Sequence, residues 1–428
     1  MIAPLFITLL LLMLLGAPIA VAIGVAPIVA MISGGMSQQL FITAQRMVTG
    51  IDSTVLMAIP LFVFAGGIMG KGGISKQIVN MSYELFGWIP GSLGVVNVIA
   101  CMFFAAISGS APATVAAIGG LMIPSMIDDG YPAGYAGALS AAAGVIGCII
   151  PPSIPFVNYG LITQQSVSEL FAAGAVPGIL MGVGLCVFNS IMATKHGWGS
   201  RNKGIDVKKC GKTFVHAFWA LLTPIIILGG IYGGIFTPTE AAAVSCVYGM
   251  LAGLFIYKGF KLPDVVEVSF DSVKSSAMIL FIVATANIFS FIVTKEQVPA
   301  KLANLIMGVT DNWVIVLLMI NIILLINGCF LETTASTYIY TPILYPLIMQ
   351  LGYDPVQFGA VMVMNLTMGL ITPPLGVNLF VAAGIDERVT LNDVIKYIWG
   401  LFAVELAVLL LITYVPSISL FLVNLIRQ

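Results

Sequence analysis

Two pairs of adjacent prolines interrupt long apolar stretches of this chain, each at a place where a straight helix would be expected. The pairs are Pro151-Pro152 and Pro373-Pro374. A proline removes a backbone donor from a helix and clashes with the preceding turn, so each pair leaves backbone carbonyls without partners. Inside a membrane such groups are costly unless they line a protein cavity or hold a ligand. We therefore interpret the two breaks as binding sites near the middle of a membrane.

The chemistry that fits these breaks is the binding of a small cation and of an anion. Freed carbonyls and helix C-termini suit a hard cation such as Na⁺, whereas helix N-termini and hydroxyl groups suit an anion. A polar stretch precedes each break by one helix: ISGSAPAT (107–114) and INGCFLETT (326–334). We predict one sodium site in each half, the first formed by Ser108, Gly109, Ser110, Gly144, Gly147 and Pro151, and the second by Gly328, Cys329, Gly369 and Thr372.

An anionic substrate would have to be held without an arginine, because the apolar segments contain no Lys, Arg or His. The predicted substrate contacts are Ser110, Thr114, Ser153, Asn158, Glu332 and Asn378. Two roles remain open for Glu332, which either receives substrate hydroxyls or amides or caps the helix that follows it. The apolar segments also contain few acidic residues, which favours Na⁺ over H⁺ as the coupling ion.

The composition predicts that membrane helices position these residues. The chain has 428 residues, of which 59% are hydrophobic and 8% charged, whereas a soluble domain carries about a quarter charged residues. Apolar runs near twenty residues, long enough for a hydrocarbon core of ~30 Å, recur at 54–70, 91–107, 170–194, 214–234, 241–257, 275–294, 311–327 and 398–423. We predict an all-α polytopic membrane protein.

Other classes of protein fit the sequence poorly. The net charge of −1 suggests no role with nucleic acid, and no CxxC pair or histidine cluster predicts a metal site other than Na⁺. A membrane-embedded enzyme would need a nucleophile with a base or a metal cluster. The two histidines lie in or beside a basic loop and supply neither, so we predict that the chain is not an enzyme.

The sequence also contains two weakly similar halves. The second proline pair follows the first by 222 residues, and the same offset pairs Gly147 with Gly369. The loop 195–212 contains Lys195, Arg201, Lys203, Lys208, Lys209 and Lys212, so we expect it in the cytoplasm. With five crossings predicted in each half, the second half is inverted relative to the first, as in many secondary transporters. We predict that 91–127 and 311–349 are re-entrant hairpins; the alternative is that each makes two complete crossings.

Seven stretches make the chain resemble the large membrane subunit of tripartite ATP-independent periplasmic (TRAP) transporters over nearly its full length. They are AIPLFVFAGGIMGKGGIS (58–75), FAAISGSAPATVAAIG (104–119), GCIIPPSIPFVNYG (147–160), GGIFTPTEAAAV (233–244), TKEQVP (294–299), GLITPPLGVNLFVAAGI (369–385) and ITYVPSISL (412–420). The resemblance implies an elevator mechanism, in which hairpins and broken helices form a moving transport domain. It also implies amphipathic arms near 72–90 and 296–309 within the scaffold.

Combined with the repeat, the resemblance predicts the domain organisation. The first inverted repeat covers 1–194, with scaffold helices in 1–90, a hairpin in 91–127 and a broken helix in 133–163. A basic cytoplasmic linker covers 195–213. The second inverted repeat covers 214–428, with scaffold helices in 214–309, a hairpin in 311–349, a broken helix in 356–383 and a last helix in 398–423.

The resemblance further implies Na⁺-driven uptake of an organic anion across the bacterial inner membrane. The implied partners are a small four-helix membrane subunit, expected as a separate polypeptide, and a soluble periplasmic substrate-binding protein. After the first tip this chain has SGSAPAT (108–114) where many dicarboxylate-type members have SGSAVAD. The lost aspartate predicts sialic acid or a related sugar acid as the substrate. The alternatives are a four-carbon dicarboxylate, a binding-protein-independent divalent-anion/Na⁺ symporter, and a channel.

Overall fold

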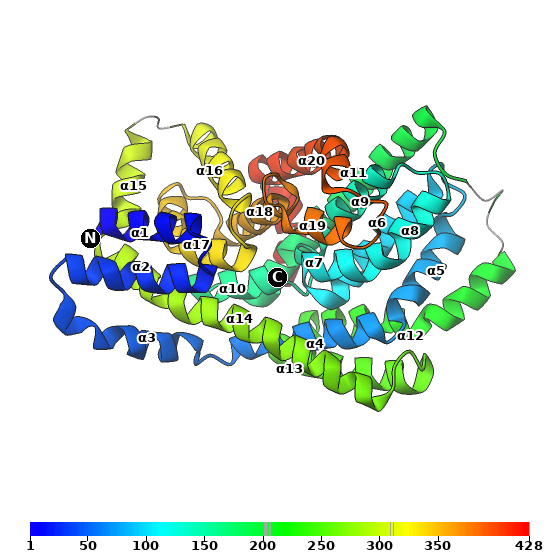
Figure 1. Cartoon of the computed structure of the whole chain (residues 1–428), viewed down its shortest axis with the longest axis horizontal. Coiled ribbons are helices and arrows are strands. Elements are labelled where there is room, and N and C mark those ends of the chain that lie inside the picture. Colours follow the sequence, from blue (N-terminus) through cyan, green and yellow to red (C-terminus); the bar gives the residue numbers. More distant parts are fainter. Residues whose placement is uncertain (201–203, 205–206, 309, 311, 428) are drawn as a thin grey trace.

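The computed structural model describes residues 1–200, 204, 207–308, 310 and 312–427, and within these residues it is built from helices without any strand (Figure 1). In these parts of the chain, 6 helices are long and apolar enough to cross a membrane, or 7 if the bent pair 37–51 and 55–71 counts as one span. Further apolar helices are shorter. This architecture agrees with the predicted all-α polytopic membrane protein.

The first half contains three groups of helices. Those before the first hairpin are α1 (Ile2–Leu14), α2 (Ile19–Ser33), α3 (Phe41–Ile51), α4 (Ala58–Lys71) and α5 (Ile74–Phe86). The hairpin follows as α6 (Ser92–Ser108), α7 (Ala111–Thr114) and α8 (Gly120–Asp128), with a π-helical turn joining the last two. The broken helix and the last helix are α9 (Ala133–Val145), α10 (Ile154–Thr163) and α11 (Val167–His196).

The second half repeats this order of elements. Its first helices are α12 (Val207–Tyr232), α13 (Pro238–Leu251), α14 (Leu262–Lys295) and α15 (Val298–Met307). The hairpin and broken helix are α16 (Trp313–Gly328), α17 (Thr333–Gln350), α18 (Pro355–Met368) and α19 (Val377–Ala383), followed by α20 (Leu391–Tyr414) and α21 (Pro416–Ile426). Both predicted helix breaks are therefore present. The inversion of the halves, and the re-entrant course of the hairpins, stay predictions.

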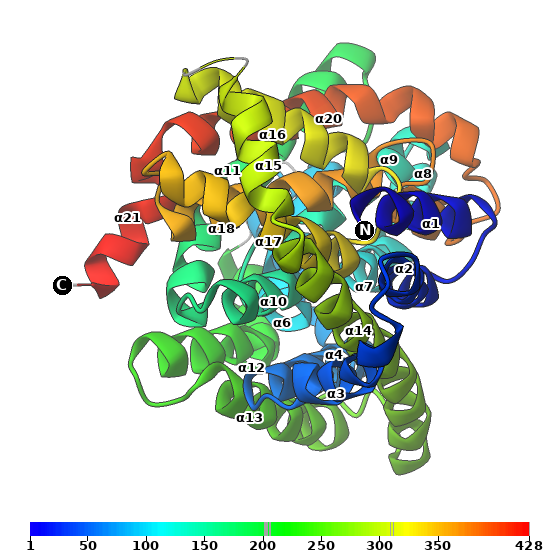
Figure 2. The ribbon, with the colours of Figure 1, turned by 90° about the vertical axis from the view of Figure 1, so that its left-hand side faces the viewer.

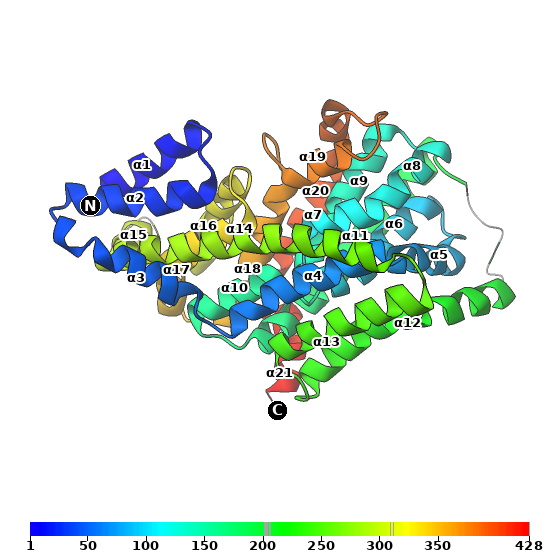
Figure 3. The same ribbon diagram turned by 60° about the horizontal axis from the view of Figure 1, so that its bottom comes forward.

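Two predicted boundaries differ from the structure. The helix predicted over 275–294 begins at Leu262, because Asp264 accepts a hydrogen bond from the Lys261 amide at 2.7 Å and starts the helix early. Figure 3 shows the resulting α14 running along much of the molecule. The basic linker predicted over 195–213 is also shorter, since α11 extends to His196 and α12 starts at Val207. Arg201 and Lys203 of that linker lie outside the described residues.

The single last helix predicted over 398–423 is wrong. The backbone leaves the helical conformation at Val415, with φ −118° and ψ 89°, and a new helix starts at Pro416. Proline has no amide hydrogen and is well tolerated at the first position of a helix. Because the apolar composition continues across this point, the hydropathy pattern gives no sign of the break. Figure 2 shows α21 turning away from α20 toward the C-terminus.

The short helix after each break packs against the opposite half of the chain. Helix α10 lies against α17, and α19 lies against α9. The Tyr159 hydroxyl on α10 donates to the Pro355 carbonyl at 2.8 Å, and the Asn378 amide on α19 donates to the Ala141 carbonyl at 3.1 Å. Arg388, in the loop after α19, pairs with Asp128 at the end of α8. The two halves are therefore interlocked around the breaks.

Glu405 on α20 is an acidic residue that this packing encloses completely. It has no exposed surface, and neither carboxyl oxygen has a hydrogen-bond partner in the described part of the chain. Its helix also buries Leu401 and Leu409. Burying a polar group without a hydrogen-bond partner costs free energy, which an apolar side chain of similar volume at the same place would not.

We expect Glu405→Met to raise the thermal unfolding midpoint in detergent by about 2–4 °C, as a gain of roughly 1 kcal/mol predicts. The measurement is intrinsic-fluorescence unfolding of the purified protein. Glu405→Gln, which keeps a polar group at the same position, serves as the control and is expected to show a smaller gain. A midpoint lowered by Glu405→Met would mean that the carboxyl group stabilises the fold.

Candidate binding site between the hairpin tips and helix breaks

A cavity of about 100 Å³ lies where both hairpin tips meet both helix breaks. Helices α7, α10 and α19, which contribute lining residues, lie near the middle of the molecule (Figure 1). The lining residues come from five elements: Gly109, Ser110 and Pro112 from the first hairpin, Cys148, Ile154 and Pro155 from the first break, Glu332, Thr333 and Thr334 from the second hairpin, Leu370 and Val377 from the second break, and Ile279 from α14. Residues far apart in the sequence thus form a single site.

The first hairpin tip rests directly on the first break through Gly109. This residue ends α6 with φ +64°, a conformation that glycine adopts without a steric penalty. A side-chain carbon at this position would lie 2.8 Å from the Pro152 carbonyl oxygen. The Gly109 carbonyl accepts a hydrogen bond from the Ile154 amide at 3.4 Å. Tip and break are therefore held in backbone contact.

Hydroxyl groups fix the shape of the first tip. The Ser108 and Thr114 hydroxyl oxygens are 2.9 Å apart, and the Thr114 hydroxyl donates to the Ser110 carbonyl at 2.8 Å. Gly147 packs against the same Ser110 carbonyl, which would lie 2.7 Å from any added side-chain carbon. Gly144 is one turn earlier on α9, close to the Ala111 carbonyl. The structure thus brings these residues of the first predicted sodium site together, with Pro151 in the adjoining break.

Ser153 organises the first break by capping α10. Its hydroxyl accepts from the Phe156 amide at 3.4 Å and donates to the Cys148 carbonyl at 2.5 Å. Ser153 thereby satisfies one donor and one acceptor that the interrupted helix leaves open. Asn158 lies one turn further into α10, where it is fully buried. Its amide has no hydrogen-bond partner among the described residues.

Glu332 shapes the second tip as the N-cap of α17. Its carboxylate accepts from the Ala335 amide at 3.3 Å and from the Thr334 hydroxyl at 3.0 Å. The predicted capping role is therefore confirmed, and the same side chain also borders the cavity. Close by, the Asn327 amide donates to the Ser336 hydroxyl at 2.7 Å and ties the end of α16 to α17.

The second tip meets the second break through two glycines. Gly328, at the end of α16, contacts Gly369 backbone to backbone. The Thr372 hydroxyl donates to the Met368 carbonyl at 2.9 Å and interacts with the Cys329 thiol. All four residues of the second predicted sodium site therefore lie together. The contact of Gly328 with Gly369 corresponds to that of the first tip with Gly147.

The direction of the helices around the cavity sets its electrostatics. Four helical segments begin at the cavity, at Ala111, Ile154, Thr333 and Val377, and helix N-termini carry partial positive charge. Two hairpin arms end beside it, at Ser108 and Gly328, and their terminal carbonyls carry partial negative charge. The lining contains no Lys, Arg or His. This arrangement can hold an anion by helix dipoles and hydroxyls and a cation by carbonyls.

The predicted substrate contacts are distributed unequally around the cavity. Ser110 and Glu332 line it. Thr114 and Ser153 hydrogen-bond within the first tip and the first break, and Asn378 connects α19 to α9. The sequence-based site residues did not include the lining residues Cys148, Thr333, Thr334 and Ile279. The two threonines follow Glu332 directly in the polar stretch 326–334, so the sequence could have indicated them. Ile279 lies in a uniformly apolar run, and nothing in the sequence distinguishes it from its neighbours.

Comparison with known proteins gives one clear family. The model described as "Tripartite ATP-independent periplasmic transporter, DctM component" matches residues 6–418. The isethionate TRAP transporter permease protein DctMQ of Oleidesulfovibrio alaskensis is 45% identical over 96% of this chain. The chain spans 64% of the length of that relative.

Two further relatives match along nearly their whole length. The C4-dicarboxylate TRAP transporter large permease protein DctM of Rhodobacter capsulatus is 38% identical, with 97% of each chain covered. The sialic acid TRAP transporter large permease protein SiaM of Vibrio cholerae is also 38% identical, over 89% of this chain and 88% of the relative.

A solved structure resembles the fold of the whole chain. The crystal structure of the Alcanivorax borkumensis YdaH transporter superimposes with a TM-score of 0.61, covering 89% of this chain and 88% of that chain. The two sequences are 14% identical, so the likeness concerns the fold alone.

Proposed function

Because the chain belongs to the DctM component family of tripartite ATP-independent periplasmic transporters, we propose that it drives Na⁺-coupled uptake of an organic anion by an elevator movement. The chain is a multi-pass membrane protein, and we place it in the bacterial inner membrane. We further propose that a small four-helix membrane subunit and a periplasmic substrate-binding protein complete the transporter.

The observation that carries this proposal is the shared cavity of the two tips and two breaks. Helix N-termini and hydroxyls at Ser110, Thr333 and Thr334 supply the groups that recognise a carboxylate or sulfonate. Carbonyls at the helix C-termini beside Gly147 and Gly369 supply oxygen ligands for Na⁺. Sodium bound there would offset the negative charge of the substrate, which otherwise faces Glu332.

We propose a small anion, such as isethionate or a four-carbon dicarboxylate, ahead of sialic acid. The cavity measures about 100 Å³, well below the ~300–1,000 Å³ of typical small-molecule sites. That space suits a molecule of a few carbon atoms better than a nine-carbon sugar acid. Sialic acid, predicted from SGSAPAT (108–114), stays in the test as a competing substrate.

Uptake into liposomes containing the purified complex tests the proposal. We expect accumulation of one small anion only when a Na⁺ gradient is imposed and the periplasmic protein is present. Isethionate, a four-carbon dicarboxylate and sialic acid are compared at equal concentration. Uptake that persists without the periplasmic protein would favour a divalent-anion symporter, and uptake without any ion gradient would favour a channel.

Sodium-site variants give a prediction for the coupling ion. We expect Ser110→Ala and Thr372→Ala each to raise the half-saturating Na⁺ concentration by about two- to tenfold, since loss of one hydrogen bond is worth roughly 0.5–1.5 kcal/mol. Uptake rate against Na⁺ concentration is the measurement. Lys212→Ala, near the start of α12, serves as the control and is expected to keep the wild-type dependence. Wild-type curves for both site variants would remove the sodium-site assignment.

A further inference from the structure

A continuous apolar groove runs along the surface between α6 and α11 and shares no lining residue with the candidate substrate site. Two cavities of about 580 Å³ and about 570 Å³ share Ile89, Val95, Cys186 and Val187 in their linings, so they form one groove. One end lies beside Ile150, near the first break. We call this surface the α6–α11 groove.

The side chains that line the inner part of the α6–α11 groove are all apolar and present only hydrocarbon and sulfur atoms. Met102 and Phe103 come from α6, and Val183 comes from α11. Val183 and Val187 are 52% and 53% exposed, although they lie in the middle of a long apolar helix. In a helix that crosses a membrane, such an exposed apolar face is solvated by acyl chains.

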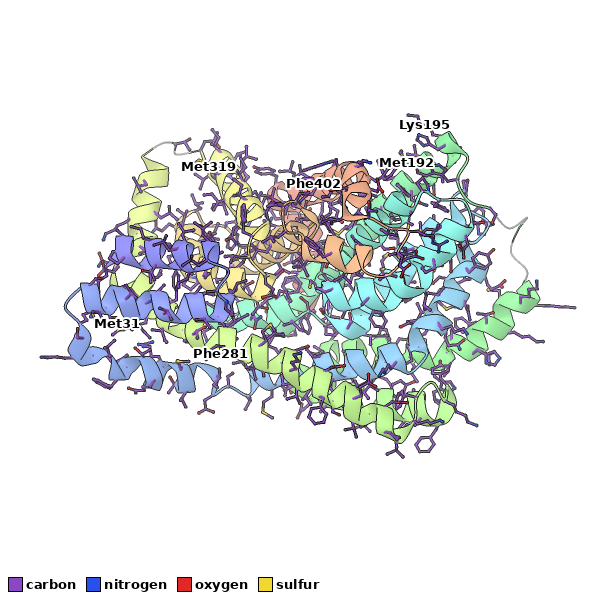
Figure 4. All side chains as sticks on the ribbon, in the orientation of Figure 1. Met31, Met192, Lys195, Phe281, Met319 and Phe402 are labelled. Carbon is purple, nitrogen blue, oxygen red and sulfur yellow. The ribbon has the colours of Figure 1, made fainter. Side chains whose placement is uncertain are left out.

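The outer end of the groove includes polar and basic side chains beside its apolar ones. Ser190, Thr194 and Lys195 line it at the C-terminal end of α11. None of the ion pairs formed by the described residues involves Lys195. Figure 4 shows Lys195 at the edge of the molecule, where α11 ends. Neither cavity lining contains an acidic residue, so this end is complementary to an anion.

The length of the groove along α11 matches the thickness of one leaflet of a bilayer. From Ile179 to Lys195 the helix rises by roughly 24 Å at 1.5 Å per residue. Half of a bilayer including its headgroup region measures about 20–22 Å. Trp88, 47% exposed and next to Ile89 of the groove, adds an aromatic residue of the type that is enriched at the membrane–water interface.

The loop between α5 and α6 is fixed in place beside the basic end. The Asn189 amide on α11 donates to the Gly91 carbonyl at 2.9 Å, and the Ser92 hydroxyl donates to the Ser200 carbonyl at 2.8 Å. Phe86, at the end of α5, and Ile89, in the loop after it, form the second wall of the groove. The groove is therefore a preformed feature with ordered sides.

We propose that the α6–α11 groove binds one anionic phospholipid. Its acyl chain lies along Met102, Val183 and Val187, and its phosphate lies at Lys195 beside the Ser190 and Thr194 side chains. A zwitterionic lipid has the same acyl chains, but the positive charge in its headgroup offsets the attraction of its phosphate to Lys195. The site is separate from the transport cavity and does not depend on the identity of the substrate.

Native mass spectrometry of the purified chain, titrated with phosphatidylglycerol or phosphatidylcholine of identical chains, tests the proposal. We expect the wild type to retain more phosphatidylglycerol than phosphatidylcholine. Lys195→Ala is expected to weaken phosphatidylglycerol retention about fivefold, as removal of one basic residue near an anionic lipid predicts. Val183→Trp, which fills the groove, is expected to reduce the retention of both lipids.

Lys76→Ala, at an exposed lysine of α5 outside the groove, is the matched control and is expected to bind as the wild type does. Size-exclusion profiles and thermal unfolding establish that each variant is folded. Equal retention of the two lipids by the wild type would overturn the proposal, and so would unchanged phosphatidylglycerol retention in both groove variants. An equal loss in Lys76→Ala would assign the effect to general surface charge.

Discussion

Gly369→Ala is expected to reduce uptake by about ten- to a hundredfold. The added methyl carbon falls on the Gly328 backbone, and a backbone segment at the end of a helix cannot move aside as a flexible side chain can. Inserting a carbon into a packed contact costs about 1–3 kcal/mol. The second tip would separate from the second break, and the carbonyls that surround the predicted sodium site would lose their alignment. Initial uptake rates in liposomes measure the effect.

A matched glycine makes the result interpretable. Gly229 on α12 has no atom within 4 Å of an added side-chain carbon, and alanine favours a helix over glycine by about 1 kcal/mol. Gly229→Ala is therefore expected to retain uptake and thermal stability. Gly328→Ala, whose added carbon lies 3.0 Å from the Gly369 Cα atom, is expected to be intermediate. Full uptake by Gly369→Ala would show that close contact between tip and break is dispensable.

Glu332→Gln is expected to separate the two roles of this residue. A glutamine oxygen can still accept the hydrogen bond from the Ala335 amide, so the cap of α17 and the thermal stability should persist. The charge that borders the cavity is lost. Because a hydrogen bond from a substrate hydroxyl to a charged carboxylate is worth about 1.5–3 kcal/mol, and sodium offsets the repulsion between the two negative charges, we expect the half-saturating substrate concentration to rise at least about tenfold. Concentration-dependent uptake and thermal unfolding are measured together.

A second capping acid controls for helix capping alone. Asp354 caps α18 by accepting from the Val356 and Gln357 amides, and it does not line the cavity. Asp354→Asn is expected to keep the wild-type half-saturation. Should Glu332→Gln also keep it, Glu332 would act only as a cap. Glu332→Ala, which removes the cap as well, is expected to lower the stability by about 0.5–2 kcal/mol.

The breaks and tips were predictable because their signals are local. A proline pair acts on its own turn of helix, and Gly109 and Glu332 act on the residues beside them. The arms near 72–90 and 296–309, which the resemblance implies, coincide with the helices α5 and α15. The local signals missed the interruption at Val415, since a single Pro416 within apolar sequence looks like a tolerated kink.

The composition of the cavity was only partly predictable, because it depends on long-range packing. Thr114 and Asn378 have the right chemistry, but their side chains are engaged in hydrogen bonds within and between the elements that surround the cavity. Ile279 reaches the cavity from α14, more than a hundred residues away from the nearest break in the first half. No periodicity in the sequence indicates which of the apolar residues of α14 faces the site.

The packing of each short helix against the opposite half couples the two predicted sodium sites. Since α10 rests on α17 and α19 rests on α9, a shift at either break is passed to the tip or helix of the other half. Occupation of one sodium site would then favour the geometry required at its counterpart. We therefore expect uptake to rise with sodium concentration more steeply than a single independent site allows, with a Hill coefficient above one.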